Sequence, residues 1–107
     1  MVHYDIVVTG RIYKVGYRFY ALQRATQLGL KGFVQYQTSS SIRIEIEGED
    51  EKVQSFLQWC KRGTSGAKVD DIQITQNDMK NYQTFQISHS EKPIHEPFFK
   101  RVMSFFF

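Results

Sequence analysis

The segment of the chain best suited to chemistry reads Gly10-Arg11-Ile12-Tyr13-Lys14-Val15-Gly16-Tyr17-Arg18. It joins a predicted strand to a predicted helix, where free backbone amides and the positive end of the helix favour an oxyanion. Arg18 adds a planar fork of donors that matches phosphate or carboxylate, and Lys14 and Arg11 add positive charge. The spacing therefore indicates an anion site; the alternative is a loop of solvated basic residues.

The residue pattern argues against metal and thiol chemistry. His3, His89 and His95 are scattered without metal-ligand spacing, so we expect surface or strand histidines and no metal site. The single cysteine, Cys60, lies on the apolar face of a predicted helix and is expected to be a buried, inert thiol. One cysteine allows neither an internal disulfide nor a cysteine metal cluster.

The elements that would position the anion segment follow from the hydrophobic periods. In chain order they are a strand over 2–12, a helix over 18–28, strands over 31–38 and 41–48, a helix over 50–62, and strands over 68–75 and 82–88. Asp70-Asp71 marks an irregularity in the fourth strand. The order is β-α-β-β-α-β, which predicts an α+β, ferredoxin-like sandwich with two helices on one face of an antiparallel sheet.

The faces of these elements can be assigned from the same patterns. In the strand over 41–48, three isoleucines face one way, and Arg43, Glu45 and Glu47 form a solvated or cross-strand-paired face. In the first helix the expected apolar stripe consists of Phe19, Leu22, Ala25 and Leu28. We expect Tyr17 and Phe19 to pack the loop and the helix onto the core.

Composition bounds the class of protein. The length of 107 residues fits one small domain, and a net charge of +3 is too low for the basic footprint of a nucleic-acid binder. Apolar runs are too short to span a membrane, and the first residues do not read as a signal peptide. These features predict a cytoplasmic protein with a folded domain over residues 1–88.

Residues 89–107 form a phenylalanine-rich C-terminal tail that holds both prolines of the chain. The tail could be disordered, cover its own domain or dock on another chain, and basic residues beside phenylalanine also allow contact with a membrane surface. Because exposed phenylalanines are an aggregation hazard, we expect residues 97–107 to be buried against this domain or a second copy of it. We expect no membrane partner.

The chain resembles the acylphosphatase family, whose hallmark loop reads Gly-x-Val-Gln-Gly-Val-Gly/Phe-Phe-Arg. Matching residues stand in register at Gly10, Ile12, Val15, Gly16, Tyr17 and Arg18. The resemblance extends over residues 3–88, through Leu28-Gly29-Leu30, Gly32-Phe33-Val34, Glu47-Gly48, Phe56, Leu57, Trp59 and Gly63. It implies the same ferredoxin-like fold.

The resemblance implies hydrolysis of the carboxyl–phosphate bond of small acyl phosphates, without a cofactor, to a carboxylate and phosphate. Arg18 would bind the phosphoryl group, and the loop would cradle it with Tyr13, Lys14, Val15, Gly16, Tyr17 and Arg18. Tyr36 stands where the family has the asparagine that orients water, and Lys14 stands where it has a glycine. A lysine there would be strained, or the loop would be reshaped. Tyr36 or a neighbour would hold the water.

Two other functions stay open at this point. The chain could be a catalytically impaired relative that binds phosphate or another anion without turnover. The strand order is also shared with RNA-recognition modules, but the strand over 41–48 lacks their aromatic residues, and its glutamates would repel a phosphate backbone. We therefore expect small-molecule acyl phosphates or inorganic phosphate as partners, and no nucleic acid.

Overall fold

A computed structural model describes residues 1–89 of the chain. Its elements are β1 (Val2–Arg11), α1 (Tyr17–Gln27), β2 (Lys31–Thr38), β3 (Ser41–Gly48), α2 (Asp50–Arg62), β4 (Lys68–Asn77) and β5 (Phe85–Ile87). Every predicted element is present. The expected burial of residues 97–107 concerns residues outside the described range and stays a prediction. No helix within residues 1–89 is long and apolar enough to cross a membrane.

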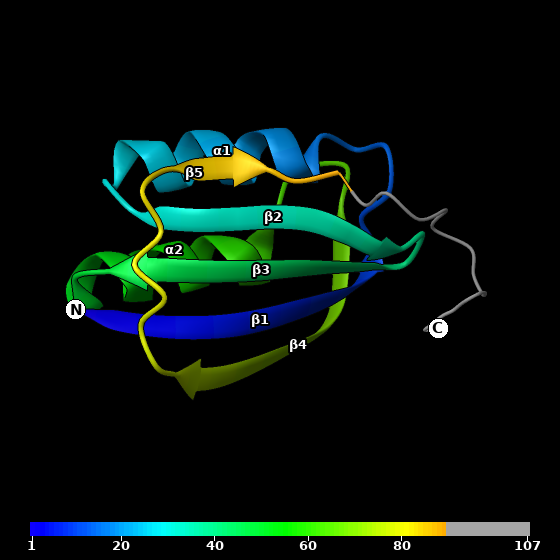
Figure 1. Cartoon of the computed structure of the whole chain (residues 1–107). Coiled ribbons are helices and arrows are strands. Elements are labelled where there is room, and N and C mark those ends of the chain that lie inside the picture. Colours follow the sequence, from blue (N-terminus) through cyan, green and yellow to red (C-terminus); the bar gives the residue numbers. More distant parts are fainter. Residues whose placement is uncertain (90–107) are drawn as a thin grey trace.

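The five strands form one sheet in the order β4-β1-β3-β2-β5, and both helices pack on the same face of it (Figure 1). The four long strands pair antiparallel, as predicted. The short β5 lies parallel to β2 at the edge, so that the sheet as a whole is mixed. The predicted ferredoxin-like α+β fold is confirmed.

A bulge in β4 lies beside the point where β1 leaves the sheet. The register between β1 and β4 shifts between Thr9 and Gly10, which leaves Asp70 without an opposite residue, in agreement with the predicted irregularity. Gly10 has φ +146°, and an added Cβ would lie 2.1 Å from the carbonyl oxygen of Lys68. Only glycine fits such a close backbone approach, so this residue fixes where the chain turns towards α1.

The core lies between the sheet and the two helices. Alternate residues of β1 and β3 supply one side of it, with Ile6 opposite Ile44. The predicted stripe of α2 is confirmed: its buried residues are Val53, Phe56, Leu57 and Cys60. The stripe packs because its spacing places these residues on one side of the helix.

The predicted stripe of α1 is partly wrong. The helix buries Tyr17, Ala21 and Ala25, whereas Phe19 is 56% exposed. Tyr17 anchors the inward face, and Phe19 lies about 200° further round the helix, since each residue turns it by about 100°. Two alanines let the helix approach the sheet closely, and Phe19 is left at the rim of the loop.

The face of the sheet away from the helices is partly covered by the connection from β4 to β5, residues 78–84, here called the strap. It crosses in front of β1, β3 and β2 (Figure 1). Beneath it Glu45 and Glu47 are buried, so this part of the face is not solvated, although the Arg43 side chain stays 40% exposed. The alternative prediction of cross-strand pairing is confirmed for the two glutamates, because both face His3 of β1. The same cover buries His3, so that His3 is a strand histidine but not a surface one.

Candidate functional site

The loop between β1 and α1 is attached firmly to the rest of the fold. The buried Tyr17 hydroxyl donates to the carbonyl oxygen of Cys60 at 2.8 Å, and its ring lies 5.0 Å from that of Trp59. The hydroxyl of Thr64 donates to the carbonyl oxygen of Val15 at 3.0 Å. Both contacts come from α2 and the residues that follow it, so they fix the loop against a rigid helix.

Cys60, which accepts the Tyr17 hydrogen bond through its backbone, is buried as predicted. Burial raises the pKa of the Cys60 thiol to about 12, because the thiolate would lose its hydration. The thiol is therefore protonated at neutral pH, which agrees with the predicted inert role.

The start of α1 offers backbone amides that have no acceptor among residues 1–89. The helix begins after Gly16, which has φ +78° and supplies no side-chain cap. The amide of Tyr20 donates to the carbonyl oxygen of Gly16 at 3.0 Å and makes the first helical hydrogen bond. The amides of residues 17–19 precede it and have no acceptor inside the helix. Together with the helix dipole they favour an anion at this point.

Tyr36 reaches from β2 into the loop. Its hydroxyl oxygen accepts a hydrogen bond from the backbone amide of Lys14 at 3.0 Å. The guanidinium carbon of Arg18 lies 4.0 Å from the centroid of the Tyr36 ring. The centroids of the Tyr36 and Tyr13 rings are 4.9 Å apart. Arg18 is thus held over an aromatic face at the start of α1, where it can meet an anion bound by the amides.

Lys14 adopts a left-handed conformation, with φ +59°. For a residue with a Cβ this conformation costs about 1–2 kcal/mol. Of the two alternatives predicted for this position, a strained lysine or a reshaped loop, the positive φ agrees with the strained lysine. The hydrogen bond from its amide to Tyr36 fixes the loop in that conformation.

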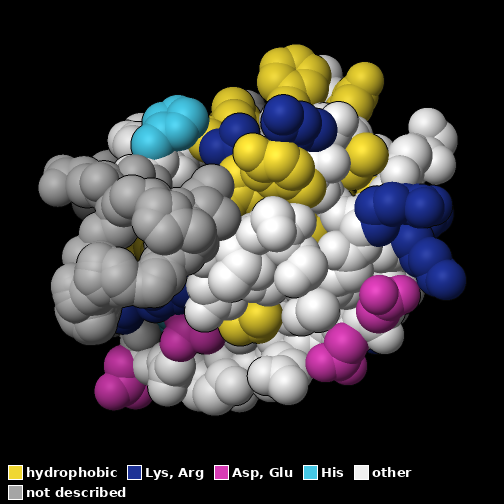
Figure 2. Space-filling view, turned by 90° about the vertical axis from the view of Figure 1, so that its right-hand side faces the viewer, with side chains coloured by type: hydrophobic (Ala, Val, Ile, Leu, Met, Phe, Trp, Pro, Cys, Tyr) yellow, Lys and Arg dark blue, Asp and Glu magenta, His cyan; other side chains and the backbone are white. Residues whose placement is uncertain are grey.

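The predicted site residues meet at one pocket of about 360 Å³. It is lined by Tyr13, Lys14, Gly16, Tyr17, Arg18, Phe19, Tyr36 and Ile87. The side chain of Val15 is not among them: it lies in a neighbouring hollow with Trp59 and Thr64, so Val15 can act only through its backbone. Figure 2 looks onto this end of the molecule and shows Lys and Arg side chains set among hydrophobic ones.

Two residues of the pocket are not predicted from the sequence. The apolar pattern places Phe19 in the core, whereas its position two residues after Tyr17 on the helix is the signal that would place it at the rim. Ile87 enters through the parallel pairing of β5 with β2, where Val34 lies opposite Ile87. A three-residue strand has no periodic signal that would reveal this partner.

Comparisons with known proteins agree on one family. The family model described as acylphosphatase matches residues 4–87. A curated acylphosphatase of Bacillus pumilus is 34% identical over 88 residues, which are 81% of this chain and 98% of that protein.

Solved structures show the same likeness. The crystal structure of acylphosphatase from Bacillus subtilis superposes with a TM-score of 0.79 at 31% identity, covering 82% of this chain and 99% of that one. An acylphosphatase structure from Coxiella burnetii has a TM-score of 0.78 at 20% identity, covers 81% of this chain and 92% of that one, and shows the fold alone.

Proposed function

Because the chain belongs to the acylphosphatase family, we propose that it hydrolyses the carboxyl–phosphate bond of small acyl phosphates at the loop of residues 13–18. The products are a carboxylate and inorganic phosphate. The observation that carries this proposal is the position of Arg18, at the start of α1, where the helix leaves its first amides without an internal acceptor, and at the pocket of the loop. A guanidinium and several amides that converge on one point suit a phosphoryl group.

The proposed chemistry is a displacement at phosphorus. A water oxygen forms a bond to phosphorus while the bond from phosphorus to the carboxylate oxygen breaks; one proton of the water stays on the phosphate and the other passes to solvent. The carboxylate is a good leaving group, so positioning and charge stabilisation are enough to accelerate the step. In this proposal Arg18 and the amides of the 13–18 loop stabilise the phosphoryl oxygens, and no cofactor takes part.

Tyr36 is the residue we propose for holding the water or a phosphoryl oxygen. Its hydroxyl accepts from the Lys14 amide, so its own proton is free to donate and one lone pair remains. The hydroxyl lies at the loop and the ring lies against Arg18, which supports a role next to the reacting phosphorus. It would supply one donor and one acceptor at the place where the family has an asparagine.

A second candidate function rests on the same contact. If the Tyr36 oxygen keeps the Lys14 amide, one donor of the cradle is taken from the substrate, and the loop would bind an anion with little turnover. The variant Tyr36→Asn separates the two. A large gain in rate would favour an impaired, anion-binding module, whereas a loss would favour tyrosine as a working residue.

The experiment that tests the proposed function combines turnover with binding. Purified protein is assayed with a simple aromatic acyl phosphate, and inorganic phosphate is added as a competitor. We expect hydrolysis above background, inhibition by millimolar phosphate, and phosphate-induced shifts of the backbone amides of residues 13–19 in NMR spectra. Hydrolysis without amide shifts would place the chemistry outside this loop. The absence of both hydrolysis and amide shifts would contradict both candidate functions.

Three further proposals come from the sequence. We propose that the folded domain ends near residue 88, that the protein acts in the cytoplasm, and that residues 97–107 allow self-association. Deletion of 97–107 should lower the thermal midpoint or dissociate an oligomer while leaving phosphate binding unchanged. An unchanged midpoint together with unchanged sedimentation would contradict the proposed role of these residues.

A further inference from the structure

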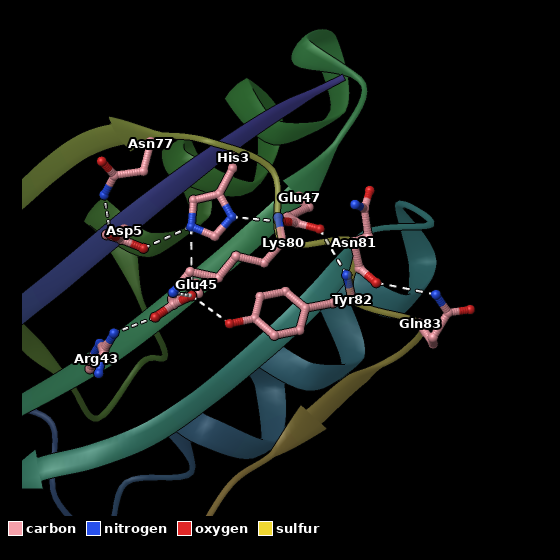
Figure 3. A network of polar contacts seen from close by, with 10 residues as sticks. All are labelled: His3, Asp5, Arg43, Glu45, Glu47, Asn77, Lys80, Asn81, Tyr82 and Gln83. Carbon is pink, nitrogen blue, oxygen red and sulfur yellow. Dashed lines mark hydrogen bonds and ion pairs between the residues drawn. The ribbon is translucent and has the colours of Figure 1, made fainter.

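A second group of polar side chains lies beneath the strap, on the sheet face opposite the helices (Figure 3). His3 and Asp5 come from β1, and Glu45 and Glu47 come from the neighbouring β3. His3 and both glutamates are buried, and the Asp5 side chain is 27% exposed. None of these residues lines the pocket of the 13–18 loop, so the group needs an explanation of its own.

The imidazole of His3 is surrounded by carboxylates. Its Nδ1 lies 2.7 Å from Oε2 of Glu47, and its Nε2 lies 2.8 Å from Oδ1 of Asp5 and 3.6 Å from Oε1 of Glu45. Ionised carboxylate oxygens only accept hydrogen bonds. Nε2 can therefore face Oδ1 of Asp5 either with a proton on the ring nitrogen or with a metal ion between the two atoms.

The outer atom of each side chain has a partner of its own. Asn77 donates to Oδ2 of Asp5, Arg43 donates to Oε2 of Glu45, and Glu47 contacts Nδ1 of His3. Nε2, Oδ1 and Oε1 lie within 4.8 Å of one another. Nε2 and Oδ1 contact each other, and Oε1 also accepts from two groups of the strap. The separations of 2.8 Å and 3.6 Å bracket the edge of about 3.3 Å expected for a tetrahedron of ligands about 2.0 Å from zinc.

We propose that His3 Nε2, Asp5 Oδ1 and Glu45 Oε1 form a binding site for a transition-metal dication of the Zn²⁺ class, which replaces the proton on the ring. Glu47 would then orient the imidazole through Nδ1, as carboxylates commonly do behind a histidine ligand. A mixed set of one imidazole and two carboxylates suits Zn²⁺ or Co²⁺ better than Mg²⁺ or Ca²⁺, which take oxygen ligands. All three ligands stand on paired strands, so the site is rigid.

Two groups of the strap contact the same oxygen of Glu45. The Lys80 ammonium lies 3.0 Å from Oε1, and the Tyr82 hydroxyl donates to it at 2.6 Å. The Lys80 side chain is 50% exposed and can turn into solvent, while the strap stays attached through the backbone amides of Lys80 and Tyr82 on Glu47. With Lys80 turned outward, one dication and Arg43 balance the three carboxylates.

The electrostatics around His3 favour a cation at Nε2. Carboxylate oxygens of Glu47, Asp5 and Glu45 lie 2.7 Å, 2.8 Å and 3.6 Å from the ring nitrogens of His3. The negative potential of these three carboxylates would attract a dication. The site cannot be recognised in the sequence, because the proposed ligands His3 and Glu45 are 42 residues apart. Only the pairing of β1 with β3 brings them together.

The test uses the full chain, with His89→Gln and His95→Gln introduced together so that these two histidines cannot bind metal. Co²⁺ is titrated and its visible absorption recorded, and Zn²⁺ binding is measured by calorimetry. We expect one equivalent of metal and visible bands typical of four-coordinate Co²⁺. Asp5→Asn should weaken binding at least tenfold, whereas the control Asp78→Asn on the strap should leave it within twofold.

Lys80→Gln distinguishes a metal site from a purely structural ionic network. Removal of the competing ammonium should strengthen Zn²⁺ binding several-fold, while a network that needs Lys80 would only lose thermal stability. The proposal is overturned if millimolar Co²⁺ produces no bands, or if Asp5→Asn binds metal as well as Asp78→Asn does. A thermal melt of each variant without metal confirms that it is folded.

Discussion

The hydroxyl oxygen of Tyr36 accepts a hydrogen bond from the backbone amide of Lys14 at 3.0 Å and joins the C-terminal half of β2 to the anion loop. The same ring lies 4.0 Å below the guanidinium carbon of Arg18. One tyrosine therefore contacts both the strained residue of the loop and its principal cation. A phosphoryl group that used the Lys14 amide would share it with the Tyr36 oxygen or displace that oxygen.

The role of the Tyr36 hydroxyl is tested most cleanly by Tyr36→Phe. The ring would stay beneath Arg18, while the group proposed to hold water is lost. We expect kcat for an aromatic acyl phosphate to fall about tenfold or more, which corresponds to the loss of a hydrogen bond worth about 1.4 kcal/mol in the transition state. The inhibition constant for phosphate should change little. An unchanged kcat would show that the hydroxyl takes no part.

The strain at Lys14 predicts a gain in stability from Lys14→Gly. Glycine adopts φ +59° without steric cost, although it also gives the unfolded chain more freedom. We expect the free energy of unfolding in urea to rise by about 1 kcal/mol. Lys14→Ala is the matched control, because alanine retains the Cβ and should change the stability by only a few tenths of a kcal/mol. Equal effects of both variants would contradict the assignment of strain.

The bulge at Gly10 predicts a large cost for Gly10→Ala. The new Cβ would meet the Lys68 carbonyl oxygen at 2.1 Å, and the backbone there has φ +146°. We expect a loss of about 2 kcal/mol or more, measured by urea unfolding. Gly29→Ala provides the comparison, since Gly29 also has a positive φ but no atom lies within 4 Å of its added Cβ. A smaller loss at Gly10 than at Gly29 would rule out the close approach as the cause.

The thiol of Cys60 reports on the attachment of the loop. It is buried and its pKa is raised to about 12, so the folded protein should resist alkylation by iodoacetamide at pH 8. Urea at an unfolding concentration should release the thiol at the rate of a free cysteine. Mass spectrometry follows both reactions. Rapid stoichiometric labelling of the folded protein would show that the contact between α2 and the loop opens readily.

Much of the fold could be predicted because its strands alternate cleanly and α2 has a regular apolar stripe. The anion loop could be predicted because glycines and basic residues cluster between a strand and a helix. The orientation of α1 could not: it depends on whether Tyr17 or Phe19 faces inward, and both are large aromatic residues. The hydrogen bond that Tyr17 makes to Cys60 decides it, and this contact spans 43 positions of the chain.

The buried polar group around His3 lay beyond sequence reasoning for a related reason. His3, Glu45 and Glu47 read as ordinary alternating strand residues, and nothing local shows that the strap covers them. Register between strands and the path of a long connection are set by the packing of the whole sheet. Tyr36 was recognised as a site residue only through the family pattern, and its contact with Lys14 required the geometry of the loop.

The most direct test of the central claim compares hydrolysis of an aromatic acyl phosphate by the wild-type protein, Arg18→Ala and Arg62→Ala. Arg62 is an exposed arginine at the end of α2, outside the pocket of the loop. If Arg18 stabilises the phosphoryl oxygens, kcat/KM should fall about 100-fold or more in Arg18→Ala and stay within about twofold in Arg62→Ala. Equal turnover by wild type and Arg18→Ala would contradict the account.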